Sequence, residues 1–385
     1  MGLSKNNTVI YLLITLIAIY SAKGALYPEG TLISRLSLLS LFALSGYYFI
    51  KVLIMKRNKG LFYCMFTFLL IINVVSYIFT ASHSSPLHFN NFAGILMALL
   101  PFYPFYYLSH KGYLKDKHLI LLLILIIPVA IANFFYNREL VLAERIGAVD
   151  ITNNAAYTFA FLIPYVYTIK GRKIYSFIAL LILLSFIILG AKRGAIVTGA
   201  GGLFFYIYYQ LKTIDKGKRL RGYLLTLIII VILGYFAHDF YMQNEYLMER
   251  MEDMVEGNSS GRDTIYSNLF NAWYKSNDAK TFYLGRGFAK TLEHSGTGHF
   301  AHNDWLELLT NFGLFGVLIY FTLFLSPIRY AFNKNNDFDK RMMMFSILAI
   351  WFGTTLFSMN YTSSNAMFQN IMLAHLLARD KILFF

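Results

Sequence analysis

The chain has 385 residues, of which 57% are hydrophobic and only 14% are charged. A soluble domain carries roughly a quarter charged residues, so this composition excludes an ordinary soluble protein. Apolar runs of about 18 or more residues recur from end to end, and no Pro/Gly/Ser-rich linker separates them. We therefore expect a single integral membrane domain over residues 1–385.

The net charge is +14, which in a soluble protein would favour nucleic acid as a partner. Here the basic residues stand in short clusters between apolar runs, where they orient a chain in a bilayer, and we expect no nucleic-acid partner. Cys64 is the single cysteine, which excludes an internal disulfide and a multi-cysteine metal cluster. We expect no cofactor and no redox chemistry.

About twelve apolar segments are long enough to be membrane-spanning helices, which predicts an all-α polytopic membrane protein. They lie near residues 7–22, 32–54, 61–80, 90–109, 118–136, 151–169, 174–191, 194–211, 222–240, 304–331, 342–359 and 365–379. With Lys5 in the cytoplasm, the short cytoplasmic connections and tail hold 22 Lys and Arg residues, against six in the short connections on the other side. Because cytoplasmic loops are enriched in basic residues, both termini are expected in the cytoplasm.

One connection is much longer than the others and covers residues 241–301, which we expect to form a large extracytoplasmic loop with short helices. The segment 245–256 has the spacing of an amphipathic helix, suited to rest on the bilayer surface or on the helix bundle. A second helix is expected from about Gly261, with Ser260 and Asp263 resembling a capping box.

Arg262 falls in the first turn of that second helix. Free N–H groups and the positive end of the helix dipole favour an anion there, so a cation at this point needs a reason. Binding of an anion is one interpretation. Snorkelling, or an ion pair with Asp263 or Glu256, is the alternative.

Lys192 and Arg193 stand between two apolar segments with almost no polar connection around them. Charges held so close to the membrane need water, an anion or a lipid head group, so this turn is either an interfacial anchor or a binding site for a lipid-linked phosphate. Small residues around it would let a neighbouring helix or a lipid chain approach closely. They are Gly190, Gly194, Gly199, Gly201 and Gly202.

His302 and Asn303 stand just before the apolar segment 304–331. A histidine at the start of a helix is favoured in its neutral form and can accept a proton as a general base. Asn303 has the residue type of a helix N-cap. His294 and His299 nearby raise the alternative of a metal site, but no metal-ligand spacing accompanies them, and we expect none.

Four motifs in this order resemble the O-antigen ligase and polymerase superfamily of bacterial membrane glycosyltransferases. They are LGAKRGAIVTGAGG, SSGRDTIYSNLFNAW, the GxG turn of YLGRGF and HNDWLELLTNFGLFG, and together they cover residues 190–316. The resemblance extends to the twelve-span topology and implies a GT-C-like arrangement of helices. This chain has Lys192 where the family usually has a small residue before the arginine.

The resemblance implies transfer of a glycan from an undecaprenyl diphosphate carrier to an acceptor hydroxyl, without a metal and with inversion. Arg193 and Arg262 would bind the diphosphate and His302 would act as the base, while Lys192, Arg286 and Asn303 are further substrate-binding candidates. The expected place is the bacterial inner membrane, with the active site on the periplasmic face. Other expected partners are membrane lipids and chain-length regulators or other polysaccharide assembly proteins.

Repeat-unit polymerase, for O-antigen, capsule or exopolysaccharide, is the preferred interpretation, with a second lipid-linked glycan as acceptor. A ligase that uses lipid A-core is the first alternative, since both enzymes share these motifs. A transporter of polysaccharide or lipid-linked glycans is the alternative from another class. A transporter would be expected to show paired halves or a polar midplane site, and neither is visible in the sequence.

Overall fold

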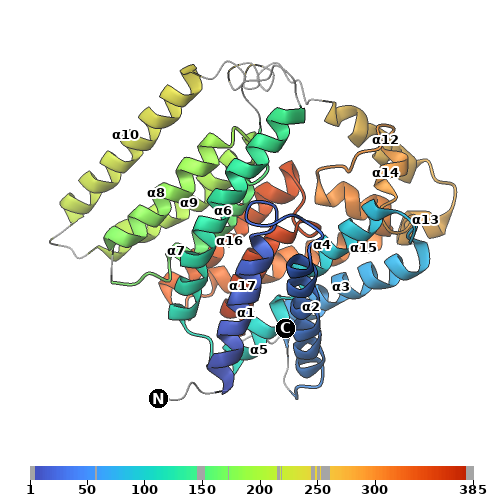
Figure 1. Cartoon of the computed structure of the whole chain (residues 1–385), viewed down its shortest axis with the longest axis horizontal. Helices are drawn as coiled ribbons and strands as arrows, with labels where there is room; N and C mark the ends of the chain where they lie inside the picture. The colour runs from blue at the N-terminus through green and yellow to red at the C-terminus, as the bar shows by residue number, and fades with distance from the viewer. Residues whose placement is uncertain are drawn as a thin grey trace.

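The computed structural model describes residues 5–56, 59–144, 152–171, 173–214, 219–243 and 261–378, with residues 217, 248 and 252 between them. Within these ranges the chain is helical and contains no strand; an isolated bridge joins Lys23 and Tyr27. The predicted all-α class is confirmed. Figure 1 shows most of the helices packed side by side, with α10 at one edge and α12, α13 and α14 grouped at one end of α15.

Every predicted span falls on a helix or on a pair of consecutive helices. The helices are α1 (Lys5–Ser21), α2 (Leu32–Leu53), α3 (Gly60–Thr80), α4 (Pro86–Leu99), α5 (Phe102–His110), α6 (Asp116–Glu144), α7 (Ala156–Val166), α8 (Lys173–Leu189), α9 (Arg193–Thr213), α10 (Arg219–Gln243), α12 (Arg262–Tyr274), α13 (Ala279–Leu284), α14 (Thr291–His294), α15 (Asp304–Phe332), α16 (Phe338–Phe357), η2 (Ser364–Ala366) and α17 (Met367–Leu377).

Five helical segments of the described chain are both long and apolar enough to cross a membrane. They are Leu32–Leu53, Gly60–Thr80, Pro86–His110, Asp116–Ala143 and Asp304–Phe332. The protein is therefore a multi-pass membrane protein by the length and composition of its helices. The count of twelve spans stays a prediction.

Two of the expected spans are shorter in the structure than the sequence suggested. α7 and α17 have 11 residues each, and every one of these residues is buried. A helix of that length rises only about 16 Å, roughly half the thickness of the hydrocarbon core. Both helices thus lie inside the bundle, where other helices rather than lipid cover them, including the polar residues Gln369, Asn370 and His375 of α17.

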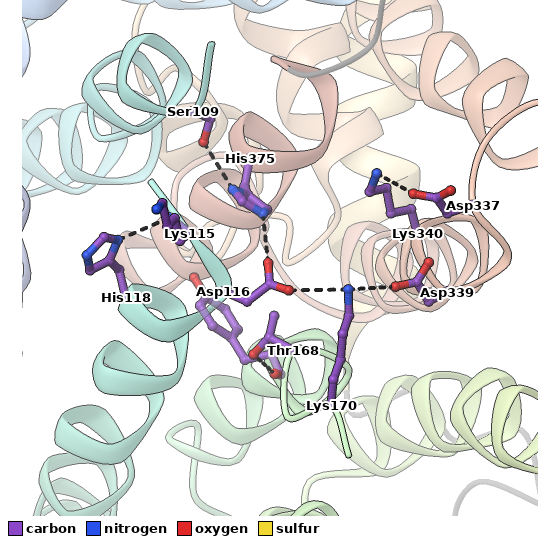
Figure 2. Close-up of polar contacts among 11 residues, drawn as sticks. Ser109, Lys115, Asp116, His118, Thr168, Lys170, Asp337, Asp339, Lys340 and His375 are labelled. Atoms are coloured by element: carbon purple, nitrogen blue, oxygen red, sulfur yellow. Dashed lines mark hydrogen bonds and ion pairs between the residues drawn. The ribbon is translucent and has the colours of Figure 1, made fainter. Parts of the chain in front are cut away.

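The ends of the helices gather at two opposite faces of the bundle. At one of them, which we call the His375 face, Asp116 at the start of α6 lies 3.2 Å from Lys170, and Lys170 lies 2.9 Å from Asp339. His375 contacts Asp116 at 3.5 Å and Ser109 at 3.1 Å (Figure 2). These contacts join the ends of α5, α6, α7, α16 and α17.

The opposite ends form what we call the His302 face. Here the Asn153 N–H donates to the carbonyl of Gly190, and the N–H of Phe288 donates to Thr80 Oγ1. The alternation of successive spans between the two sides of the membrane stays a prediction. Which face lies outside the cell stays a prediction.

Small residues bring α9 and α16 into close contact at the centre of the bundle. A Cβ atom on Gly353 would lie 2.5 Å from Thr198, and one on Gly202 would lie 3.0 Å from Ile350. The sequence predicted that these small residues would let a neighbouring helix or a lipid chain approach closely. In the structure a neighbouring helix, α16, packs against them. This packing holds the start of α9 firmly beside the end of α16.

Candidate functional site

The α8–α9 connection is a tight turn on the His302 face. A Cβ atom on Gly190 would lie 2.6 Å from Ala156, and Ala191 has a positive φ of 48°. Lys192 is the N-cap of α9 and Arg193 is its first residue; both are half-buried. The predicted short turn between two apolar helices is thus confirmed. Its closeness to the membrane surface and its binding of phosphate stay predictions.

Arg262 is the first residue of α12, as the sequence predicted. The predicted cap is wrong: the N-cap is Gly261, with a φ of 79° and no side-chain hydrogen bond. Ser260 and the predicted helix over 245–256 fall outside the described residues, apart from positions 248 and 252.

The Arg262 charge lies at the C-terminal end of another helix. Its Nη1 donates to the carbonyl of Phe357, the last residue of α16, at 3.1 Å. The Tyr157 hydroxyl donates to the same oxygen at 3.4 Å. A cation is favoured at a helix C-terminus, so α16 offsets the repulsion from the N-terminus of α12.

Asn303 caps α15, as predicted. Its side-chain oxygen accepts from the N–H groups of Trp305 at 3.0 Å and Leu306 at 3.2 Å. Its amide donates to the carbonyl of Leu356 at 3.3 Å, next to the oxygen that Arg262 contacts. Asn303 therefore fixes the start of α15 against the end of α16. Its binding of substrate stays a prediction.

His302 is exposed and lines a cavity of about 790 Å³. Partial loss of hydration within the cavity is the main cause that lowers its pKa to about 4, and the nearby positive charges of Arg262, Lys192 and His299 lower it further. The imidazole is thus neutral at neutral pH and able to accept a proton. The structure brings His302, Arg262 and Lys192 into one electrostatic group from three separate segments of the chain.

Backbone strain is concentrated at this group. Among the described residues, only Ala191, Ala289 and His302 are non-glycine residues with a positive φ, and His302 has a φ of 51°. Such a conformation costs of the order of 1–3 kcal/mol and is typical of functional sites. Two of the three residues lie at the candidate site. Ala191 directly precedes Lys192 and Arg193, and His302 is the candidate base itself.

The rest of the cavity wall is rich in amides and hydroxyls. It includes Asn133, Asn137, Asn154, Asn365, Ser358 and Tyr136. The charged lining residues are Lys23 and Glu29, which form an ion pair at 3.3 Å. The wall thus offers neutral hydrogen-bonding groups and aromatic rings, which suit a ligand with many hydroxyl groups.

Two buried acids in the HNDWLELL segment, which the sequence reading missed, hold the site together. Asp304 accepts from the Tyr320 hydroxyl at 2.6 Å and from the N–H of Asn360 at 3.0 Å. Glu307 accepts from the Thr291 hydroxyl at 2.7 Å and from the N–H of Ala301 at 2.6 Å. The signal in the sequence was the presence of two acidic residues at the start of an apolar helix. Such residues usually have hydrogen-bonding partners elsewhere in the fold.

The GxG turn is attached to a kink in α15. Gly313 has a φ of 60° inside the helix, which interrupts the regular hydrogen bonding. The freed carbonyls of Thr310 and Asn311 accept from the N–H groups of Arg286 and Gly287, both at 2.9 Å. A Cβ atom on Gly285 would lie 2.4 Å from Asn311, so the two backbones touch.

Arg286 is not part of the His302 cavity. It lines a second cavity of about 710 Å³, and its Nη2 donates to the carbonyl of Ala272 at 2.7 Å. His294 lines the same second cavity. Within the described part of the chain, no three His, Cys, Asp or Glu side chains are grouped so that they could hold a metal ion.

The helices and the polar groups at their ends define a multi-pass membrane protein whose candidate site residues lie at one face of a helix bundle. Residues 178–321 match the sequence model of the O-antigen ligase family. The match includes Lys192, Arg193, Arg262, Arg286 and His302 and confirms the resemblance to the O-antigen ligase and polymerase superfamily. No curated protein matches the chain.

Proposed function

We propose that this protein transfers a glycan from an undecaprenyl diphosphate carrier to an acceptor hydroxyl. The observation that carries the proposal is that His302 lines a cavity rich in hydrogen-bonding groups and lies within the electrostatic influence of Arg262 and Lys192. A lipid-linked donor needs this combination: cations for its diphosphate, a base for the acceptor and a polar space for the glycan.

In the proposed reaction, His302 takes the proton from the acceptor hydroxyl as its oxygen attacks the anomeric carbon. The bond from that carbon to the diphosphate oxygen breaks, and the carrier leaves as the free diphosphate. Arg193, Arg262 and Lys192 stabilise the negative charge that develops on it, so the transfer proceeds without a metal. A single displacement inverts the anomeric carbon.

The donor itself would make His302 a better base. The charges of Arg262 and Lys192 contribute to the low pKa of the free protein. A bound diphosphate cancels these charges, so the pKa of His302 rises when the donor is in place. Binding of the donor would therefore raise the basicity of His302.

We place this reaction in the bacterial inner membrane, with both termini in the cytoplasm and the His302 face in the periplasm. The charge bias of the short connections supports this orientation. No nucleotide sugar is needed on that side, because the leaving diphosphate supplies the driving force.

The acceptor we propose is a second lipid-linked repeat unit, which makes the protein a polymerase. A ligase acting on lipid A-core would use the same groups. Surface glycan from a deletion strain separates them: loss of long chains with single repeats still attached to the outer lipid supports the polymerase. Full-length chains left on the carrier support the ligase.

The proposed base is tested with purified protein and a lipid-linked donor. His302→Ala should retain donor binding but lose about 10²–10⁴-fold in transfer rate, which is the usual contribution of a positioned base. His299→Ala is the matched control, since His299 is an exposed neighbour on the same segment, and it should be milder. A wild-type rate for His302→Ala would remove the base from the mechanism.

A further inference from the structure

The second cavity is a groove at the edge of the bundle where α3, α13 and α15 meet (Figure 1). Its volume is about 710 Å³, and it shares no lining residue with the His302 cavity. It is large enough for a lipid head group together with the first part of a chain.

One wall of the groove is apolar and exposed. Ile71, Val75 and Phe79 of α3 line it, as do Leu284 of α13 and Phe315 of α15. Phe79 is 80% exposed and Leu284 is 57% exposed. Because α3 is long and apolar enough to span a bilayer, this wall is suited to lipid chains.

The end of the groove nearest α13 is basic. Lys280, Arg286 and Lys290 line it, and the two acids there are engaged within the protein. Asp278 accepts from the N–H groups at the start of α13. Glu293 accepts from Lys290 at 2.5 Å, which engages one of the three N–H donors of that ammonium group.

The basic end retains donors for a ligand. Arg286 donates from one guanidinium nitrogen to Ala272, whereas a guanidinium carries five N–H donors. His294 lies close enough to respond to this positive charge. Burial is the main cause that lowers the pKa of His294, and the charge of Arg286 lowers it further.

We propose that this groove binds an anionic phospholipid of the surrounding bilayer, with its phosphate on Lys280, Arg286 and Lys290 and its chains along α3 and α15. An apolar wall that ends in a basic cluster matches the two halves of such a lipid. The donor diphosphate is a poorer fit, because it has to reach His302 in the other cavity. This site is independent of the proposed reaction.

The proposed contact between the lipid phosphate and the basic residues is tested by native mass spectrometry. The purified full chain is delipidated and titrated with phosphatidylglycerol. Lys280→Gln combined with Lys290→Gln should weaken binding roughly 30-fold. The matched control is Lys275→Gln, an exposed lysine outside the groove. Equal binding of phosphatidylcholine, or no loss in the double variant, would overturn the proposal.

The proposed contact between the lipid chains and the apolar wall is tested by filling the groove with a larger side chain. Val75→Trp should block phosphatidylglycerol, whereas Ile78→Trp should not, because Ile78 is 55% exposed on the same helix but does not line the groove. Equal binding by both variants would overturn the assignment. So would displacement of the phospholipid by equimolar undecaprenyl phosphate, which would make the groove a substrate site.

Discussion

The Arg262 guanidinium and the carbonyl of Phe357 are joined by a hydrogen bond of 3.1 Å across 95 residues of sequence. The contact fixes the first residue of α12 at the last residue of α16. It places a positive charge beside His302 without using all five donors of the guanidinium. The remaining donors are the ones we propose for the diphosphate.

This arrangement predicts the effect of replacing Arg262. Arg262→Ala should lower the transfer rate by about 10²–10³-fold, comparable to the loss of one donor in an oxyanion hole. Arg262→Lys should recover part of it, because it keeps the charge but loses the forked geometry. Lys275→Ala, at the other end of α12, is the control and should be close to wild type. Full activity in both Arg262→Ala and Arg193→Ala would leave the diphosphate without its proposed ligands.

The low pKa of His302 predicts the pH profile. Protonation removes the base, so kcat/KM should fall as pH drops through about 4, and kcat should fall at a higher pH because the bound donor raises the pKa. Lys192→Gln removes a positive neighbour and should move the kcat/KM limb to higher pH. Lys212→Gln, at the far end of α9, should not move it. A kcat/KM limb at pH 6.5 or above in the wild-type protein would contradict the lowered pKa of His302 in the free protein.

The same shift has a consequence for stability. The pKa of His302 is about 4 in the folded protein against 6.5 ordinarily, so the unfolded chain binds the proton more readily. The contribution of this residue to stability is therefore constant above pH 6.5 and decreases as pH falls towards 4. His302→Ala should remove that part of the pH dependence in thermal unfolding.

The contact between the GxG turn and the kink of α15 predicts a difference between two glycines. Gly285 and Gly298 have φ values of 76° and 72°, so alanine strains the backbone at both. Only at Gly285 would the new Cβ meet another backbone, 2.4 Å away; at Gly298 nothing lies within 4 Å. Gly285→Ala should cost about 1–3 kcal/mol more than Gly298→Ala in unfolding measured in detergent. Equal losses would show that the contact is not tight.

The orientation in the membrane is tested with alkaline phosphatase fusions. A fusion near Ser276, in the connection between α12 and α13, should be active, and one near Asn335, between α15 and α16, should be inactive. The opposite pattern would place the His302 face in the cytoplasm, where a reaction with a periplasmic lipid-linked glycan is impossible.

The sequence by itself determined the class of fold and the local elements of the site. Apolar runs located the helices, because burial of a helix in lipid or in a bundle needs a continuous apolar segment. The start of α12 near Gly261 and the Asn303 cap followed from local backbone chemistry. The motif order around Arg193, Arg262 and His302 indicated the family that the comparison then matched.

Only the tertiary structure decided which of these residues meet. Lys192 acts on His302 while Arg286 lies in a different cavity, although the sequence treated both as accessory cations. The burial of α7 and α17, and the partners of Asp304 and Glu307, depend equally on segments far apart in the chain. Local pattern carries no information about such contacts, because they are set by how whole helices pack against one another.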